Sequence, residues 1–123
     1  MVLQIDDNLK IGEVQERFHD CFPYLKIAFY AKAHKRFEPS ETKFLLDEKS
    51  LLADIRKTHQ NGNLEIKSWH TVARVEHELK QNFGLNAQIF RTGKKGEWVQ
   101  TAESDALTLE EQSRFAYDWR LNK

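Results

Sequence analysis

Apolar and polar residues alternate at the start of the chain and then change to a helical spacing. Residues 2–6 alternate, which is typical of a short strand with one buried face. Residues 10–22 place apolar side chains three and four positions apart, which predicts a helix with one face on a core. Pro23 ends this helix, and residues 25–30 alternate again as a second strand.

The same succession of strand, helix and strand returns in the second half of the chain. Thr71 is placed to cap the second helix, and Gly84 is placed to end it in a left-handed conformation. The glycine-rich turn 92–96 then joins the two strands of a hairpin. The predicted elements are a strand at 64–68, a helix at 71–83 and strands at 85–91 and 97–101.

The two halves also match position by position. Apolar residues recur at an offset of 61 up to the end of the helix and at an offset of 60 after it. The slip lies in the turn, where Pro23-Tyr24 stands opposite Gly84, so corresponding strand residues keep the same face. The matched pairs are Leu3–Leu64, Ile5–Ile66, Ile11–Val72, Val14–Val75, Phe18–Leu79, Phe22–Phe83, Leu25–Leu85, Ile27–Ala87, Phe29–Ile89 and Tyr30–Phe90. Internal duplication explains the match, with repeat 1 at about 2–57 and repeat 2 at about 63–121; a coincidence of two similar patterns is the alternative.

Each copy carries a further strand and helix after the shared unit. In the first copy, residues 42–46 are predicted as an antiparallel strand, and Ser50 is predicted to cap a short helix. In the second copy, Thr108 and Glu111 form a capping box for the last helix. The order β-α-β-β-α, repeated once, predicts a single α+β domain over all 123 residues. We expect internally duplicated βαββα units arranged as a ferredoxin-like split βαβ sandwich with extra hairpin strands.

Composition narrows the class of partner. Lys+Arg and Asp+Glu number 19 each, so the formal net charge is zero, which disfavours bulk nucleic acid or an anionic membrane but permits a local basic patch. One cysteine excludes an intramolecular disulfide, which favours a cytoplasmic location. The sequence shows no signal peptide and no apolar run near the roughly 20 residues that span a bilayer.

The second copy resembles an uncharacterised family of small bacterial proteins with the pattern FGLNxQVFRxSGxxWLxTTxTDxWTLxEQN. The matching residues are Phe83-Gly84-Leu85-Asn86-Ala87-Gln88-Ile89-Phe90-Arg91, Gly96-Glu97-Trp98, Thr101, Asp105 and Thr108-Leu109-Glu110-Glu111-Gln112. The first copy, with Phe22-Pro23-Tyr24-Leu25-Lys26, is similar to the N-terminal half of that family. Lys10 and Leu107 depart from the pattern, where Thr and Trp are usual. The resemblance implies relatives and brings with it no activity, cofactor or catalytic residue.

For each candidate catalytic or metal-binding residue, we favour a structural role over a chemical one. Cys21 shares the apolar stripe of its helix, so we expect it to face the core rather than act as a nucleophile. The five histidines lack the spacing of a zinc site and are expected on the solvated surface, with His70 and His77 as a weak alternative pair. Asp6-Asp7 is expected to start a loop. We therefore predict no catalytic residue, no metal and no cofactor.

Two basic turns are the candidate ligand-binding sites. They follow corresponding strands in the two halves of the chain. Lysine and arginine side chains of this kind contact the phosphate groups of nucleic acids. Trp98 is expected in the core together with Trp119, and would add stacking to the second turn if it were exposed. The candidate residues are Lys32, Lys35, Arg36, Arg91, Lys94, Lys95 and Trp98.

Three functions stay open. We favour a non-catalytic binding or assembly module that forms a homo-oligomer through a sheet edge or a helix face, or that binds another protein. The first alternative is a nucleic-acid or phospho-ligand binder that uses the basic turns. The second is a small enzyme whose site converges from distant positions in the sequence.

Overall fold

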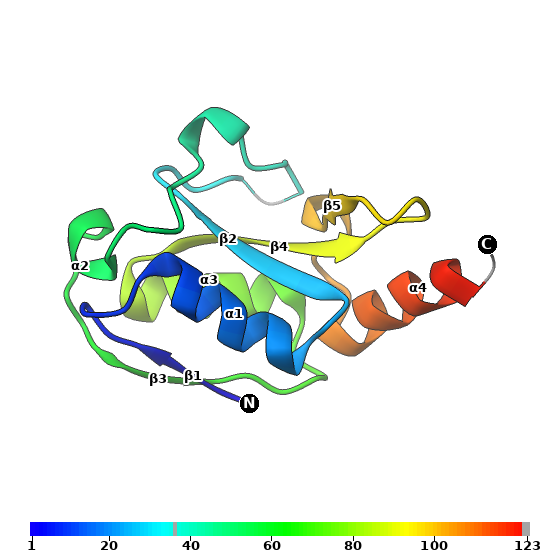
Figure 1. The fold of residues 1–123 in the computed structure, drawn as a ribbon, viewed down its shortest axis with the longest axis horizontal. Coiled ribbons are helices and arrows are strands. Elements are labelled where there is room, and N and C mark those ends of the chain that lie inside the picture. The colour runs from blue at the N-terminus through cyan, green and yellow to red at the C-terminus, as the bar shows by residue number, and fades with distance from the viewer. Residues whose placement is uncertain (36, 122–123) are drawn as a thin grey trace.

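The computed structural model describes residues 1–35 and 37–121, for 118–121 the backbone alone. Over these residues the chain forms four α-helices, two short 3-10 helices and five strands (Figure 1). In chain order they are β1 (Val2–Ile5), α1 (Ile11–Cys21), β2 (Leu25–Tyr30), η1 (Thr42–Phe44), α2 (Leu52–Ile55), β3 (Gly62–Glu65), α3 (Val72–Phe83), β4 (Asn86–Thr92), β5 (Trp98–Gln100), η2 (Ala102–Ser104) and α4 (Leu109–Leu121). The predicted α+β class is confirmed.

The strands form two small antiparallel sheets. One sheet pairs β1 with β3, and the other has the order β2-β4-β5. Helices α1 and α3 lie between the two sheets (Figure 1). A ferredoxin-like split βαβ sandwich gathers its strands into one sheet, so the structure does not clearly show that predicted arrangement.

Both sheets pair positions that correspond in the two halves of the sequence. Leu3 lies opposite Leu64 in the β1–β3 ladder, at the offset of 61 that the sequence match shows. Ala28 lies opposite Gln88 in the β2–β4 ladder, at the offset of 60. A two-fold axis between equivalent units produces pairing of this kind, because each position then meets its own equivalent. Each sheet therefore pairs a strand from the first half of the chain with the corresponding strand from the second half.

In each half of the chain, a segment that follows the second strand returns to the first turn of the long helix. The Gly12 N–H donates to the Glu48 carbonyl oxygen at 2.8 Å, and the Ala73 N–H donates to the Asp105 carbonyl oxygen at 2.8 Å. These bonds satisfy backbone N–H groups that a helix N-terminus leaves without partners inside the helix. In the second copy they place Asp105 beside α3, next to the site described below.

One apolar core joins both copies. The inner faces of the two sheets and the facing stripes of α1 and α3 supply its side chains. Its members without measurable exposure include Leu3, Ile5, Ile11, Val14, Phe18, Leu25, Ile27, Phe29, Ile66, Val72, Val75, Leu79 and Ile89. Burial of each large apolar side chain contributes roughly 1.5–3 kcal/mol, so the packing fixes α3 firmly against β4.

Several local signals in the sequence are confirmed. The Thr71 Oγ1 atom accepts the Arg74 N–H at 3.1 Å as the cap of α3, and Gly84 ends that helix at φ 66°. The capping box of α4 is complete, because Thr108 and Glu111 each accept the backbone N–H of the other, at 3.1 and 3.0 Å. The predicted hairpin forms between β4 and β5.

The prediction for residues 42–46 is wrong. Residues 42–44 form a 3-10 helix, held by a local hydrogen bond from Leu45 N–H to the Thr42 carbonyl oxygen. The antiparallel contact with β2 is a single bridge between Tyr30 and Leu45. Ser50 is not the cap of α2 either, since Leu51 holds that position without a side-chain cap bond.

Four further side chains differ in exposure from the prediction, and one of them, His34, is only 11% exposed because it pairs with Glu76 in the site described below. Cys21 is exposed, because it is the last residue of α1 and the buried stripe of that helix ends at Phe18. Trp98 is 37% exposed rather than in the core, since it lies on the edge strand β5. His70 is buried rather than solvated, and its Nδ1 atom accepts the Lys67 N–H at 3.2 Å. The side chain of Trp119 lies outside the described residues.

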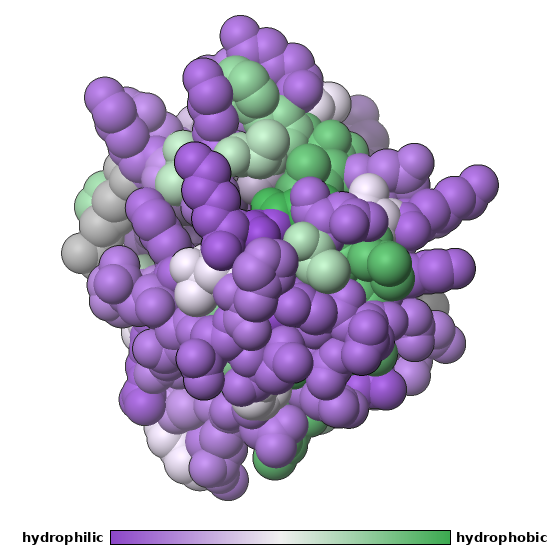
Figure 2. All heavy atoms as spheres, turned by 90° about the vertical axis from the view of Figure 1, so that its left-hand side faces the viewer, coloured by the Kyte–Doolittle hydropathy of each residue, from purple (hydrophilic) through white to green (hydrophobic). Residues whose placement is uncertain are grey.

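The face that carries α2 is largely hydrophilic. Figure 2 shows apolar side chains there in small patches, most of them toward the top of the view. No broad apolar interface is visible on this face. Within the described residues, none of the helices combines the length and apolar character that crossing a membrane requires.

Candidate functional site

The two groups of predicted basic residues lie at opposite ends of the β2–β4 pair. Lys32 and Lys35 follow the end of β2, whereas Lys94 and Lys95 follow the end of β4, and these strands run antiparallel. Arg36 lies outside the described residues. The structure therefore does not join the two turns into one basic surface.

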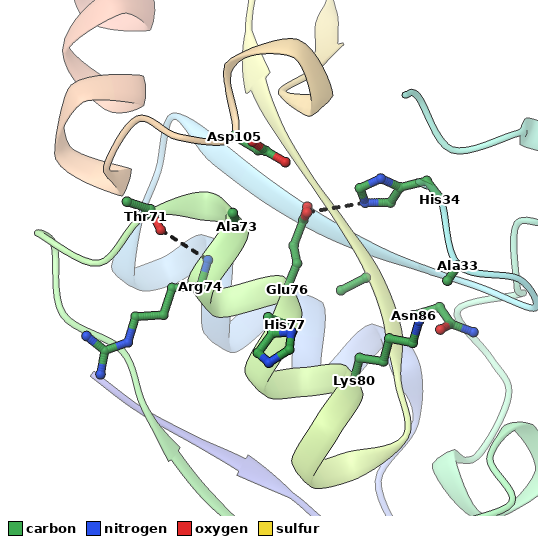
Figure 3. Close-up of a pocket in the computed structure, with 11 residues that line it drawn as sticks. Ala33, His34, Thr71, Ala73, Arg74, Glu76, His77, Lys80, Asn86 and Asp105 are labelled. Atoms are coloured by element: carbon green, nitrogen blue, oxygen red, sulfur yellow. Dashed lines mark hydrogen bonds and ion pairs between the residues drawn. The ribbon is translucent and has the colours of Figure 1, made fainter. Parts of the chain in front are cut away.

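A cavity of about 560 Å³ lies between α3 and the segment that follows β2 (Figure 3). This volume is within the range of about 300–1,000 Å³ that small-molecule sites occupy. Its lining residues are Ala33, His34, Thr71, Ala73, Arg74, Glu76, His77, Lys80, Asn86, Ala87 and Asp105. They come from four separate parts of the chain, and none was a predicted site residue.

His34 and Glu76 meet inside this cavity. The His34 Nε2 atom lies 3.2 Å from Glu76 Oε1, and its Nδ1 atom lies 2.9 Å from the Lys35 carbonyl oxygen. The second Glu76 oxygen, Oε2, accepts the Ile89 N–H at 2.9 Å. Only 11% of the His34 side chain and 8% of the Glu76 side chain are exposed, so the pair is largely removed from water.

Each member of this pair changes the titration of the other. The hydrogen bond with Glu76 raises the pKa of His34 from 6.5 to about 9, although burial acts in the opposite direction. Burial raises the pKa of the Glu76 carboxyl, and the hydrogen bonds from His34 and Ile89 oppose this rise. The negative charge of Asp105 raises the pKa of both groups. The cavity thus holds two acidic groups and an imidazole that keeps its proton at neutral pH.

Gln15 occupies the position in α1 that corresponds to Glu76, at the offset of 61. Its Nε2 atom donates to the Ile27 carbonyl oxygen at 2.9 Å, so both side chains satisfy a backbone group of the strand beside their helix. Gln15 does so as an uncharged donor, and Glu76 does so as a carboxylate acceptor. The charge of Glu76 is therefore an additional property of the second copy.

Basic side chains stand at the rim of the cavity. Arg74 and Lys80 come from α3, and both are exposed. Arg74 pairs with Glu78 at 3.1 Å and points away from the His34–Glu76 pair, whereas Lys80 extends toward Asn86 (Figure 3). The cavity therefore holds the charged pair of His34 and Glu76 together with Asp105 inside, and further positive charge at its mouth.

The lining is better suited to hydrogen bonding than to covalent chemistry. Thr71 is the lining residue that carries a hydroxyl group. Its oxygen already accepts the Arg74 N–H as the cap of α3. Cys21 is at the end of α1 and does not line the cavity. Within residues 1–35 and 37–121, no group of three or more His, Cys, Asp or Glu side chains is placed to hold a metal ion.

A second groove, of about 310 Å³, lies at the β4–β5 hairpin. Tyr24 and Trp98 are its aromatic lining residues; the others are Pro23, Thr92, Gly93, Gly96 and Ala116. Lys94 and Lys95 are exposed in the turn between its two glycines. Lys94 and Lys95 are therefore next to the groove that Trp98 lines, although neither is among its lining residues.

Arg91 does not join this groove. Its Nε atom donates to Gln112 Oε1 at 3.0 Å, which turns the side chain toward α4.

Lys26, which was not a predicted site residue, contacts the aromatic rings at the hairpin. Its Nζ atom lies 4.9 Å from the centre of the Phe90 ring and 5.1 Å from that of Trp98.

The acidic pair after β1 has a structural role. Asp7 Oδ1 lies 2.8 Å from Arg56 Nη2, and Asp7 Oδ2 lies 2.9 Å from His59 Nδ1. Burial acts to raise the pKa of Asp7, but Arg56 and His59 outweigh it and leave the pKa below its ordinary value. Arg56 also donates to the carbonyl oxygen of Phe83, so it ties the first copy to the end of α3.

Comparisons with protein-family models, with curated proteins and with solved structures give no match to this chain. The candidate function therefore depends on the geometry of the two sites.

One feature of the sequence points to the cavity, namely a charged residue on the apolar stripe of α3. Glu76 lies at a core position of α3, since it follows Val72 by four residues and adjoins Val75 on the stripe. A charged residue at such a position needs a partner, because burial of an unpaired charge is costly. The partner, His34, is 42 residues away and could not be identified from spacing.

Proposed function

We propose that this chain is a non-catalytic binding module and that the cavity containing His34 and Glu76 is its ligand site. The observation that carries the proposal is the largely buried ionisable pair inside a cavity of ligand size. The counterpart Gln15 supports it, because the corresponding position in the first half of the chain contacts its strand through an uncharged amide.

The charges of the lining favour a small ligand with two different ends. The carboxyl groups of Glu76 and Asp105 suit a protonated amine or another hydrogen-bond donor. Lys80 at the rim suits an acidic group. A compact amino acid or an amino phosphate has both ends, and we propose this chemical class.

A titration followed by ¹H–¹⁵N spectra tests where such a ligand binds. The probes are β-alanine and phosphoethanolamine, and ethylamine and propionate serve as controls that carry one end each. We expect the amide signals of Ala33, Ala73 and Ala87 to move with the two-ended probes and to move less with either control. If neither two-ended probe shifts these amides at millimolar concentration, the proposed ligand class is wrong.

Internal duplication is a second proposal, about the origin of the chain. The pairing of Leu3 with Leu64 and of Ala28 with Gln88 supports it, since both ladders centre on residues that correspond in the sequence. The divergence between Gln15 and Glu76 then means that only the second copy acquired the charged cavity.

Self-association stays a proposal, and the contacts of β2 restrict how it would occur. Gln15, His19 and the Leu46 N–H contact the carbonyl oxygens of Ile27, Leu25 and Phe29 at 2.8–2.9 Å. These contacts cover the free edge of β2, as natural proteins commonly cover a sheet edge. An oligomer would therefore use another surface, and light scattering over a range of concentrations would show whether one forms.

A further inference from the structure

The β4–β5 hairpin combines aromatic rings, a groove and positive charge on one side of the molecule. Tyr24 and Trp98 line the groove, and Trp98 is 37% exposed although it is a large aromatic residue. The two glycines, Gly93 and Gly96, add no side chains to the groove they line. An aromatic-lined space of about 310 Å³ suits a planar ring, because rings stack on aromatic side chains.

The aromatic surface continues beyond the groove. The His19 ring meets the Trp98 ring edge-on with centroids 6.0 Å apart, and the Tyr117 ring meets Tyr24 at 5.9 Å. The Lys26 Nζ atom lies over the Phe90 ring and the Trp98 ring, 4.9 and 5.1 Å from their centres. These contacts hold Tyr24 and Trp98 in place, which lowers the entropic cost of stacking a ligand ring on them.

The charges beside the groove favour an anionic ligand. Lys94 and Lys95 lie in the turn between the two lining glycines, and Lys26 lies over the Trp98 ring. Glu97 is the acidic residue of the turn, and its carboxylate accepts the Lys95 backbone N–H at 3.3 Å. Three lysines against one glutamate leave this side positive although the whole chain is neutral.

We propose that this groove binds single-stranded nucleic acid, with one base stacked between Tyr24 and Trp98 and the adjoining phosphates at Lys94 and Lys95. Bases stack on aromatic side chains while lysines contact the backbone, which is the combination that sequence-tolerant single-strand binders use. Charge distinguishes this ligand from a proline-rich peptide, which would also fit an aromatic groove but has no use for three lysines. The site is separate from the cavity of His34 and Glu76, so either proposal can fail without the other.

Fluorescence anisotropy with a labelled oligouridine of about 12 nucleotides tests the inference, at roughly 20 mM and 150 mM salt. We expect binding at low salt with a slope of log K against log salt of about −1.4 or steeper, because each phosphate contact to a single strand contributes about −0.7. Trp98→Leu should weaken binding about tenfold through lost stacking. Lys94→Glu with Lys95→Glu should weaken it at least as much and should flatten the salt dependence.

The other basic turn supplies the matched control. Lys32→Glu with Lys35→Glu makes the same change in net charge at the opposite end of the β2–β4 pair, and it should leave the affinity within about twofold. The inference is overturned if the oligonucleotide does not bind at low salt, or if both double substitutions weaken binding equally. It is also overturned if a proline-rich peptide changes the tryptophan fluorescence of the wild-type protein but not that of Trp98→Leu, while the oligonucleotide changes neither.

Discussion

Glu76 and His34 are the residues on which the account of the cavity depends. The hydrogen bond between them holds a proton on the imidazole, and the Ile89 N–H holds the carboxylate in place. Because the folded-state pKa of His34 is raised to about 9, the stability that this proton confers is complete below about pH 6.5 and is lost as the pH rises through about 9.

A histidine titration followed by NMR checks this assignment directly. In the wild-type protein, the His34 ring signal should titrate with a midpoint near 9. In Glu76→Gln, the midpoint should fall by well over one pH unit, because the carboxylate is lost and the ring stays largely buried. A wild-type midpoint near 6.5 would show that the two groups do not interact in solution.

Substitutions at Glu76 separate its charge from its structural role. Glu76→Gln keeps an oxygen for the Ile89 N–H but removes the charge that holds the proton on His34, so its loss of unfolding free energy should be present at neutral pH and should shrink as the pH rises through about 9. Glu76→Leu also leaves that buried N–H without its acceptor, which should add a loss of about 1–3 kcal/mol. Urea denaturation at neutral pH and above about pH 9 compares the two variants, and a loss in Glu76→Gln that does not depend on pH would contradict the pairing with His34.

At the scale of elements, the helix termini show how local chemistry fixes the fold. Thr71 and Thr108 accept backbone N–H groups at the starts of α3 and α4, whereas Ser50 does not cap α2. Thr71→Ala and Thr108→Ala should each lower the free energy of unfolding by about 1 kcal/mol, and Ser50→Ala should change it little. Urea denaturation of the three variants checks this order, which a large loss in Ser50→Ala would contradict.

The same elements show what could be predicted from the sequence. The capping box at Thr108 and Glu111 is a local signal, and it appears in the structure as predicted. No side chain of segment 42–46 is fully buried, and Phe44 and Leu46 are only half-buried, so burial does not force its short apolar run to form a strand. The cavity was not predicted because its parts converge only through tertiary pairing, which brings His34 to α3.

At the scale of the whole molecule, the two halves of the chain meet at residues that correspond in the sequence match. Leu3 and Leu64 face each other in the β1–β3 ladder, and both are buried in the shared core. Each substitution to Ala should cost about 2–5 kcal/mol. Because the two side chains are direct cross-strand neighbours, the double variant should lose measurably less than the sum of the single losses. Additive losses in urea denaturation would show that the residues are not in contact.

The central claim is that the charged cavity of the second copy is a ligand site. The most direct test is the affinity of phosphoethanolamine for the wild-type protein and for Glu76→Gln, with Glu16→Gln on the surface of α1 as the charge-matched control. We predict at least about a tenfold loss in Glu76→Gln, since a hydrogen bond to a charged group is lost, and no change in Glu16→Gln. Equal affinity in all three proteins would contradict the claim.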